Sequence, residues 1–96
     1  MQFTTERREN GSKGAFVAIA EDGTRAGEMT YSWAGQDKFI IDHTEVEEQY
    51  AGMGVGKIIF ESAVGFAREK QVKIMPLCPF AASMFKKSDA YKDVLF

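Results

Sequence analysis

Three glycines alternate with other residues in the segment 50–57, which reads YAGMGVGK. Glycine loses more conformational freedom on folding than any other residue, so this spacing is expected only where the backbone must come close to another group. A helical pattern begins at Val55, and the N-terminus of a helix presents free N–H groups and a partial positive charge. The spacing therefore predicts a loop that binds an anion, such as a phosphate group, through the amides of Gly52, Gly54 and Gly56.

Two common phosphate-binding motifs do not fit this loop. The P-loop, GxxxxGK[ST], matches the pair 56–57 but needs glycine where Ala51 stands and serine or threonine where Ile58 stands. The dinucleotide fingerprint, GxGxxG, starting at Gly52 needs glycine in place of Lys57, and it belongs early in a chain of repeated βαβ units. The alternative is an ordinary turn before a helix, but such a turn rarely needs three glycines.

The loop has to be positioned by a strand before it and a helix after it. Residues 39–46 begin as an apolar run and end polar, which is typical of a central strand whose far end opens into a site. From Val55 the apolar residues follow the i, i+3, i+4 spacing of an amphipathic helix. Gly65 within this helix costs about 1 kcal/mol relative to alanine, so we expect it to pack closely against a neighbour.

The segments before the loop predict an antiparallel meander. Residues 14–20 form a small-apolar and β-branched run, and residues 27–33 alternate between two faces as a half-buried strand does. The Asp-Gly pair in the turn 21–24 supplies the positive φ of a tight hairpin between them. With the strand 39–46, these elements make up the first half of a mixed α/β fold.

The segments after the helix predict a parallel addition to this sheet. Residues 72–77 are typical of a short strand, so strand, helix and strand form a βαβ unit with a right-handed crossover. Pro76 cannot donate a ladder hydrogen bond, and we expect strand pairing to stop there on one side. Residues 80–87 are expected to form a short helix, and residues 88–96 a final turn or helix.

The composition excludes several classes of protein. At 96 residues and 10.7 kDa the chain has room for one domain, which we expect to span residues 1–96. Hydrophobic residues make up 45% of it, and no apolar run approaches the roughly 20 residues that span a bilayer, so neither disorder nor membrane spanning is expected. A net charge of −2 does not suit binding to nucleic acid, which depends on clustered positive charge.

The cysteine and histidine counts narrow the class further. Cys78 is the single cysteine and cannot form an internal disulfide, and residues 1–4 contain no basic segment that leads into an apolar stretch. We therefore expect a cytoplasmic protein, and we expect it to be a monomer. One histidine and one cysteine are too few for a zinc site, so no metal is predicted.

The order of these segments resembles the GCN5-related N-acetyltransferases, and among them the very short members that consist of little more than the acetyl-coenzyme A (acetyl-CoA) binding core. The resemblance covers most of the chain from Tyr31 to its end. It implies an acetyltransferase fold in which the strands 39–46 and 72–77 separate into a V that takes the pantetheine arm of acetyl-CoA. Four segments carry it, namely IDHTEV at 41–46, the glycine loop at 50–57, GFARE at 65–69 and PLCPFA at 76–81.

The family loop reads Gln/Arg-x-x-Gly-x-Gly/Ala, and its backbone amides hold the pyrophosphate of coenzyme A. Gly54 and Gly56 match the two small positions, whereas Ala51 replaces the Gln or Arg and removes a side chain from the phosphate site. Lys57 would add positive charge to the same site. The resemblance implies that the cofactor is held by Thr44, Val46, Ala51, Gly52, Met53, Gly54, Val55, Gly56, Lys57, Cys78, Pro79, Phe80, Ala81, Met84, Phe85 and Lys87.

Two polar residues in the strand before the loop are candidates for catalysis, since acetyl transfer needs an unprotonated nucleophile and a proton for the departing thiolate. His43 suits either a general base or a structural role at the strand end. Glu45 either removes a proton from an amine or belongs to the solvated run that continues with residues 47–48. Strand alternation places both residues on the face of Phe39 and Ile41, unless a bulge intervenes.

Cys78 is the third candidate for catalysis. It could accept the acetyl group as a nucleophile, protonate coenzyme A, or be a buried inert cysteine. Its frame of Pro76 and Pro79, with a helix N-terminus beyond, favours a thiolate. Larger family members often use a tyrosine in the helix after the last core strand as the proton donor, but this helix offers Phe80 and Phe85, and Tyr91 comes late in the chain.

The resemblance implies an N-acetyltransferase that moves the acetyl group of acetyl-CoA to an amine of a protein, a peptide or a small molecule. Longer members carry two helices between their first strands, where this chain has only tight turns, so the acceptor groove should be open and shallow. The alternative is a module that binds acetyl-CoA or coenzyme A with little or no turnover.

Overall fold

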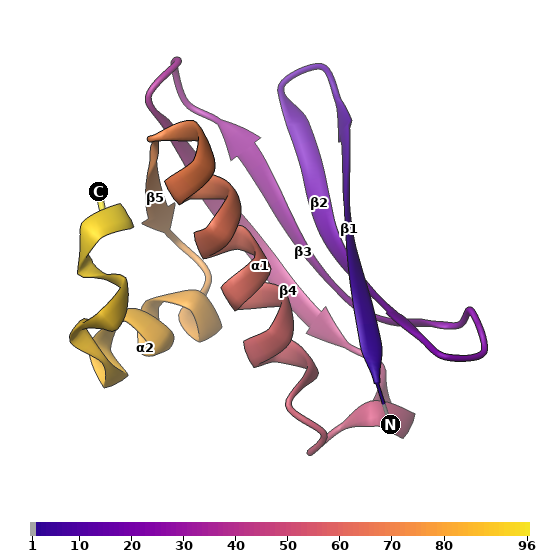
Figure 1. Cartoon of the computed structure of the whole chain (residues 1–96). Helices are drawn as coiled ribbons and strands as arrows, with labels where there is room; N and C mark the ends of the chain where they lie inside the picture. Colours follow the sequence, from indigo (N-terminus) through magenta and orange to yellow (C-terminus); the bar gives the residue numbers. More distant parts are fainter. Residues whose placement is uncertain (1) are drawn as a thin grey trace.

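The computed structural model describes residues 2–96, which form a five-stranded sheet with its helices on one face (Figure 1). Neighbouring strands along the chain are also neighbours in the sheet, and only the last pair is parallel. The strands are β1 (Phe3–Asn10), β2 (Lys13–Ala20), β3 (Arg25–Trp33), β4 (Lys38–Val46) and β5 (Lys73–Pro76). The helices are η1 (Glu48–Tyr50), α1 (Val55–Lys70), α2 (Pro79–Lys87) and η2 (Asp89–Val94). The predicted mixed α/β fold is confirmed.

Strand β1 was not predicted from the sequence. Its residues FTTERREN carry no alternating apolar side chains, because it is an edge strand and all of it except Phe3 is exposed. It pairs with β2 along its whole length, from Phe3 opposite Ala20 to Asn10 opposite Lys13. The strand is therefore held by backbone hydrogen bonds, which leave no hydrophobic pattern in the sequence.

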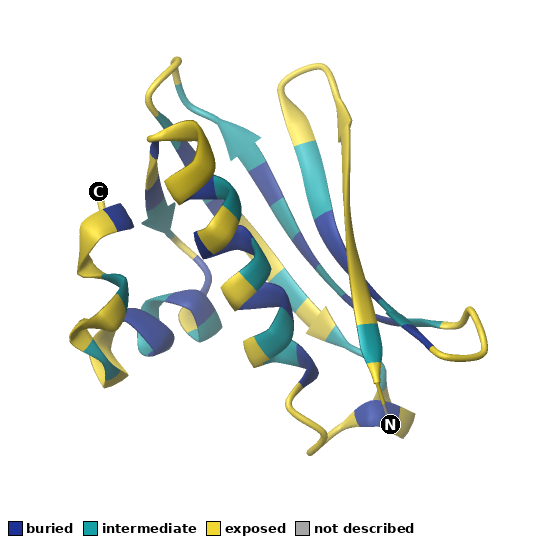
Figure 2. Ribbon diagram, in the orientation of Figure 1, coloured by how far each residue is buried: buried dark blue, intermediate teal, exposed yellow. Residues whose placement is uncertain are grey.

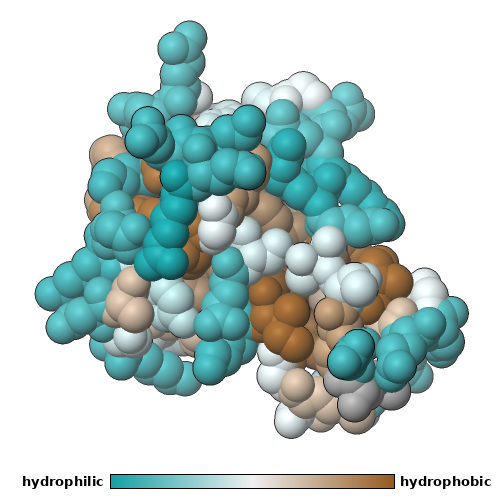
Figure 3. Space-filling view, in the orientation of Figure 1, coloured by the Kyte–Doolittle hydropathy of each residue, from teal (hydrophilic) through white to brown (hydrophobic). Residues whose placement is uncertain are grey.

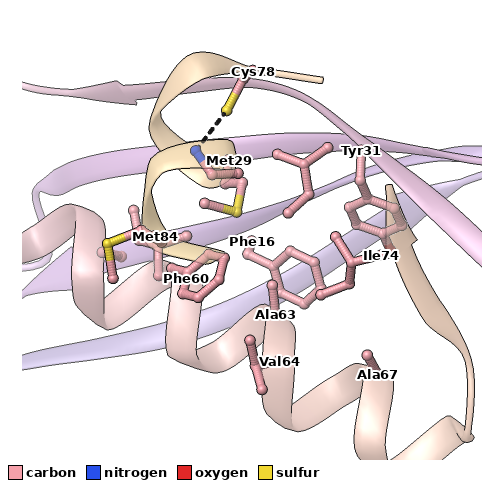
Figure 4. Packing of buried hydrophobic residues seen from close by; sticks show 14 of the residues in the cluster. Phe16, Met29, Tyr31, Phe60, Ala63, Val64, Ala67, Ile74, Cys78 and Met84 are labelled. Atoms are coloured by element: carbon pink, nitrogen blue, oxygen red, sulfur yellow. Dashed lines mark hydrogen bonds between the residues drawn. The ribbon is translucent and has the colours of Figure 1, made fainter. Parts of the chain in front are cut away.

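Helix α1 lies across the sheet and forms the other half of the core. Its buried residues face the sheet and its outer face is exposed, as the colours in Figure 2 show. Phe60 and Ala63 belong to one cluster with Phe16 and Tyr31 of the sheet (Figure 4). Burying a side chain of the size of Phe60 stabilises the fold by about 1.5–3 kcal/mol. None of the helices in residues 2–96 has the length and apolar character needed to cross a membrane.

The expectation for Gly65 is wrong. A Cβ atom placed on Gly65 would meet nothing within 4 Å, and the residue is exposed on the outer face of α1. No close packing therefore requires glycine at this position.

A bulge in β4 decides where its polar residues point. Thr30 lies opposite His43 but Tyr31 lies opposite Ile41, so Asp42 is an extra residue in β4. Beyond the bulge, Thr44 is opposite the buried Met29 and continues the core face of the strand. The residues next to it in the strand therefore lie on the sheet face that no helix covers.

This register corrects the expectation for two of the predicted catalytic residues. In the absence of a bulge, His43 and Glu45 were expected on the face of Phe39 and Ile41, which is the core face. Both are exposed, and both lie on the opposite face of the sheet from α1. The physical reason is the extra residue in the bulge, which reverses the alternation of the side chains that follow it.

Candidate functional site

The strands β4 and β5 separate at Pro76, where strand pairing was expected to stop. Their last residue pair is Ile41 opposite Pro76, and the N–H groups of Leu77 and Cys78 both donate to the Ile41 carbonyl at 3.2 Å. Beyond this point β4 continues to Val46, whereas the segment that follows β5 turns into α2. Within the described chain, residues 42–46 thus have no strand beside them on the β5 side, and their backbone is free to bond a ligand there.

A pocket of about 650 Å³ begins where β4 ends, between the glycine loop, the first turn of α1 and the segment that joins α2 to η2. Its volume lies in the range of typical small-molecule and cofactor sites. In the orientation of Figure 1, Figure 3 shows hydrophobic residues beside the first turns of α1 and mostly hydrophilic ones over the β1–β2 hairpin at the opposite end. The pocket is lined by Val46, Tyr50, Ala51, Gly52, Gly54, Val55, Gly56, Lys57, Phe80, Met84, Lys87, Ser88 and Tyr91.

The lining combines residues expected from the sequence with residues that were not. Most of the glycine loop and three residues of α2, namely Phe80, Met84 and Lys87, were expected there. Tyr50, Ser88 and Tyr91 were not, because only the packing of η1 and η2 against α1 brings them to the loop. The remaining expected cofactor residues do not line the pocket, and they are Thr44, Met53, Cys78, Pro79, Ala81 and Phe85.

The three glycines of the loop are needed for two different reasons. Gly52 and Gly54 have φ values of 80° and 79°, which side-chain-bearing residues rarely adopt, and a Cβ on either would meet nothing within 4 Å. Gly56 is helical, but a Cβ there would lie 2.7 Å from the ring of Phe80. The first two glycines thus shape the loop, and the third lets α2 approach α1.

The loop ends in a helix start without a side-chain cap. Gly54 is the N-cap residue of α1, and the first hydrogen bond of the helix runs from the Ile58 N–H to the Gly54 carbonyl at 3.1 Å. The N–H groups of Val55, Gly56 and Lys57 precede that bond and have no carbonyl within the helix to donate to. All three residues line the pocket, so the geometry suits an anionic ligand.

The charged side chains at the pocket favour the same kind of ligand. Lys57 and Lys87 line it, and no aspartate or glutamate does. Among residues 2–96, neither lysine has a carboxylate within 4.0 Å. The pocket is therefore positively charged in a chain whose net charge is −2.

Cys78 lies beside the point where β4 and β5 separate, and its thiol is bonded on two sides. Its Sγ accepts the N–H of Ala81 at 3.3 Å, the contact that is dashed in Figure 4, and so caps helix α2. The Oγ1 of Thr44 lies 3.2 Å from the same sulfur. Cys78 is only 4% exposed, so the thiol bridges the two arms of the V from inside the core.

His43 and Glu45 lie on the other side of β4 from Cys78, so the structure does not bring the three candidate catalytic residues together. The Glu45 carboxylate accepts a hydrogen bond from Arg25 Nη2 at 2.9 Å. The Arg25 guanidinium holds the pKa of that carboxyl below its usual value, which makes Glu45 a weaker base. Residues 2–96 contain no cluster of three or more side chains suited to hold a metal ion.

The sheet is an antiparallel meander to which α1 adds a parallel strand, and the last two strands separate beside a pocket that begins at the end of β4. This arrangement is that of an acetyltransferase fold. The family model described as GCN5-related N-acetyl-transferase matches residues 15–94. This chain belongs to that family, as its sequence resemblance implied.

Known proteins agree with this assignment. Streptothricin acetyltransferase of Streptomyces lavendulae is 33% identical over 63 residues, which are 65% of this chain and 33% of that protein. The chain thus spans about a third of the length of this curated relative. A GCN5-like protein of Staphylococcus aureus, solved by NMR, is 34% identical with a TM-score of 0.71 over 95% of this chain and 87% of the other.

A more distant structure has the same fold. The acetyltransferase of Elizabethkingia anophelis, solved with acetyl-CoA bound, matches 88% of this chain and 72% of its own with a TM-score of 0.69. The two sequences are 12% identical, so this likeness concerns the fold alone.

Proposed function

We propose that the chain is an N-acetyltransferase that binds acetyl-CoA in the pocket at the glycine loop and transfers the acetyl group to an amine. The uncapped N-terminus of α1 carries this proposal, because its free N–H groups face a pocket with two lysines and no carboxylate. Membership of the family supports it. In this proposal residues 1–96 act as one monomeric, cytoplasmic domain that needs neither metal nor nucleic acid.

The chain would hold acetyl-CoA in two ways, by attracting the negative charge of its pyrophosphate and by bonding its pantetheine arm with the protein backbone. The N–H groups of residues 55–57 would bind the pyrophosphate, and Lys57 would add a positive charge beside it. The backbone of residues 42–46, which has no strand on its β5 side, would bond the pantetheine arm along the V. Acetyl-CoA supplies the reactive thioester, and a backbone N–H of β4 near Thr44 would polarise its carbonyl.

The acetyl group can reach the amine in one step or two. In direct transfer the amine nitrogen forms the new bond to the carbonyl carbon, the C–S bond breaks, and the thiolate takes up the proton that the amine gives up. In the two-step route Cys78 first accepts the acetyl group and its proton goes to coenzyme A; the amine then takes the acetyl group and returns a proton to Cys78. Cys78 lies where the two strands separate, and this position supports a direct role for Cys78 rather than for His43 or Glu45.

A second candidate function is a module that binds acetyl-CoA without turnover. One observation favours it: the Cys78 thiol is buried and bonded on two sides, while His43 and Glu45 face away from the core side of β4. In that arrangement none of the three candidate catalytic residues is free to act as a base beside the place proposed for the thioester.

Binding is tested by calorimetry with acetyl-CoA on the wild type and on Gly54→Glu. A carboxylate placed among the phosphate-binding amides should weaken binding roughly 100-fold, because like charges held close together cost several kcal/mol. Gly23→Glu is the matched control, since Gly23 also has a positive φ of 88° and open space around it but does not line the pocket. Equal affinity of Gly54→Glu and the wild type would refute the assignment of the loop.

Turnover is tested by intact-mass spectrometry after incubation with acetyl-CoA and a panel of amines that includes a lysine peptide, a free peptide N-terminus and a polyamine. An acetylated amine supports the enzyme, and an acetylated Cys78 supports the two-step route. If neither product forms while acetyl-CoA still binds, the binding module is the better description. A Cys78→Ser variant with full activity would exclude the covalent role.

A further inference from the structure

The pocket presents positive charge at two separate places. Lys57 stands in the first turn of α1, next to the free N–H groups of the glycine loop. Lys87 is the last residue of α2 and comes to the pocket from the other wall. A single phosphate group needs only one of these places, so the pocket suits a ligand with two phosphate centres.

The pocket wall near Lys87 also carries an aromatic ring, that of Tyr91, and the hydroxyl of Ser88. The ring of Tyr91 packs edge-on against Phe60 at 5.0 Å, and its hydroxyl lies 3.3 Å from Glu61 Oε2, so the position of the ring is defined. Ser88 accepts the Ala90 N–H at 3.1 Å through its Oγ. Its hydroxyl hydrogen is not used in that bond and can still be donated to a ligand.

Coenzyme A has two phosphate centres, a pyrophosphate and a phosphate on the 3′ position of its ribose, with the adenine ring nearby. We propose that Lys87, assisted by the Ser88 hydroxyl, binds the 3′-phosphate and makes the pocket select coenzyme A over 3′-dephospho-coenzyme A. This inference rests on the proposed function, in which the glycine loop and Lys57 bind the pyrophosphate. Lys87 is then a specificity-determining residue, because it acts on a group that takes no part in acetyl transfer.

The expected effect is moderate because Lys87 is exposed. A solvated lysine contributes much less than a buried ion pair, and salt weakens its attraction further. We expect the wild type to bind coenzyme A about 5-fold more tightly than 3′-dephospho-coenzyme A at low salt. Raising the ionic strength should reduce this ratio.

The test measures both ligands by calorimetry on four proteins: the wild type, Lys87→Gln, Lys57→Gln and Lys86→Gln. Lys87→Gln should lower the affinity for coenzyme A to that for 3′-dephospho-coenzyme A, and it should leave the affinity for 3′-dephospho-coenzyme A unchanged. Lys57→Gln should lower the affinity for both ligands by the same factor, since both carry the pyrophosphate. Lys86→Gln is the matched control, because Lys86 is an exposed neighbour in α2 that does not line the pocket, and it should change neither affinity.

Three results would overturn the inference. One is a wild type that binds the two ligands equally, and another is a Lys87→Gln variant that keeps the wild-type ratio. The third is an equal loss of both ligands in Lys87→Gln, which would place Lys87 at the pyrophosphate. A wild type that binds neither ligand would instead refute the proposed function itself, so the two failures are distinguishable.

Discussion

The two ends of the sheet differ in how their polar groups are partnered. At the end away from the glycine loop, Glu9 Oε1 accepts hydrogen bonds from Arg7 at 2.8 Å, the Tyr31 hydroxyl at 2.7 Å and Trp33 Nε1 at 2.8 Å. Arg7 also lies over the ring of Phe66 at 4.3 Å. At the loop end, the first N–H groups of α1 have no side-chain cap at all.

The difference separates an end whose contacts stabilise the fold from an end whose hydrogen-bond donors are available to a ligand. The Glu9 cluster closes the aromatic core, and it satisfies the hydroxyl of Tyr31, a residue only 1% exposed. An unbonded hydroxyl at that depth would cost about 1–3 kcal/mol. The loop end gives up the contribution of an N-cap, about 1 kcal/mol, and so keeps its donors available. Substitutions at the two ends test whether stability and binding separate in this way.

The largest loss of stability is expected from Gly14→Ala at the closed end. A Cβ on Gly14 would lie 2.5 Å from the Tyr31 ring and 2.6 Å from the backbone carbonyl of Arg8. A backbone atom cannot move aside as a side chain can, so we expect a loss of about 3 kcal/mol in the free energy of unfolding. Urea denaturation measures it. A loss below about 0.5 kcal/mol would show that this end is not tightly packed.

Gly56→Ala at the open end should affect both stability and binding. Its Cβ would lie 2.7 Å from the Phe80 ring, so this ring, which lines the pocket, must shift. Gly65→Ala in the same helix meets nothing, and it should gain about 1 kcal/mol. We expect the two variants to differ by about 2 kcal/mol in the free energy of unfolding.

The binding readout separates the same two variants. Calorimetry should find weaker acetyl-CoA binding in Gly56→Ala and wild-type binding in Gly65→Ala. Wild-type affinity in Gly56→Ala would contradict the view that close approach of α2 shapes the pocket. A destabilised Gly65→Ala would contradict the open space at that position.

The smallest effect is expected from the Glu9 carboxylate, as a dependence of stability on pH. The hydrogen bonds from Trp33 and Tyr31 hold the pKa of Glu9 below its usual value of 4.5. The folded state therefore binds the proton less readily than the unfolded state does. The stability that Glu9 contributes is complete above pH about 4.5, and it is lost as pH falls through the lower pKa of the folded state.

Glu9→Gln isolates this contribution. The difference in the free energy of unfolding between wild type and variant should be below about 1 kcal/mol near neutral pH, because the carboxylate is partly exposed to solvent. The difference should shrink as the pH falls below 4.5. Urea denaturation at several pH values measures it. A difference that does not change with pH would show that the charge of Glu9 plays no part in closing this end.

The spacing of apolar residues predicts a helix or strand correctly where that element faces the core with a regular period. Helix α1 begins at Val55 as its apolar spacing predicts, and β5 pairs up to Pro76, the residue that lacks an N–H donor. The sequence did not predict β1, whose charged residues pair through their backbone. The close packing expected at Gly65 was wrong, because the surroundings of Gly65 depend on which side of α1 meets the sheet. The β4 bulge was beyond prediction as well, since no residue type in 38–46 requires an extra residue at Asp42.

The sequence by itself determined the order of the elements from β2 onward and the start of α1 directly after the glycine loop, because these features depend on neighbours along the chain. The tertiary structure decided what surrounds the loop. It turned His43 and Glu45 to the face without helices, buried Cys78 beside Thr44, and brought the end of α2 to the loop. Such contacts depend on strand register and on helix packing between residues that are far apart in the sequence, and residue types alone do not specify them.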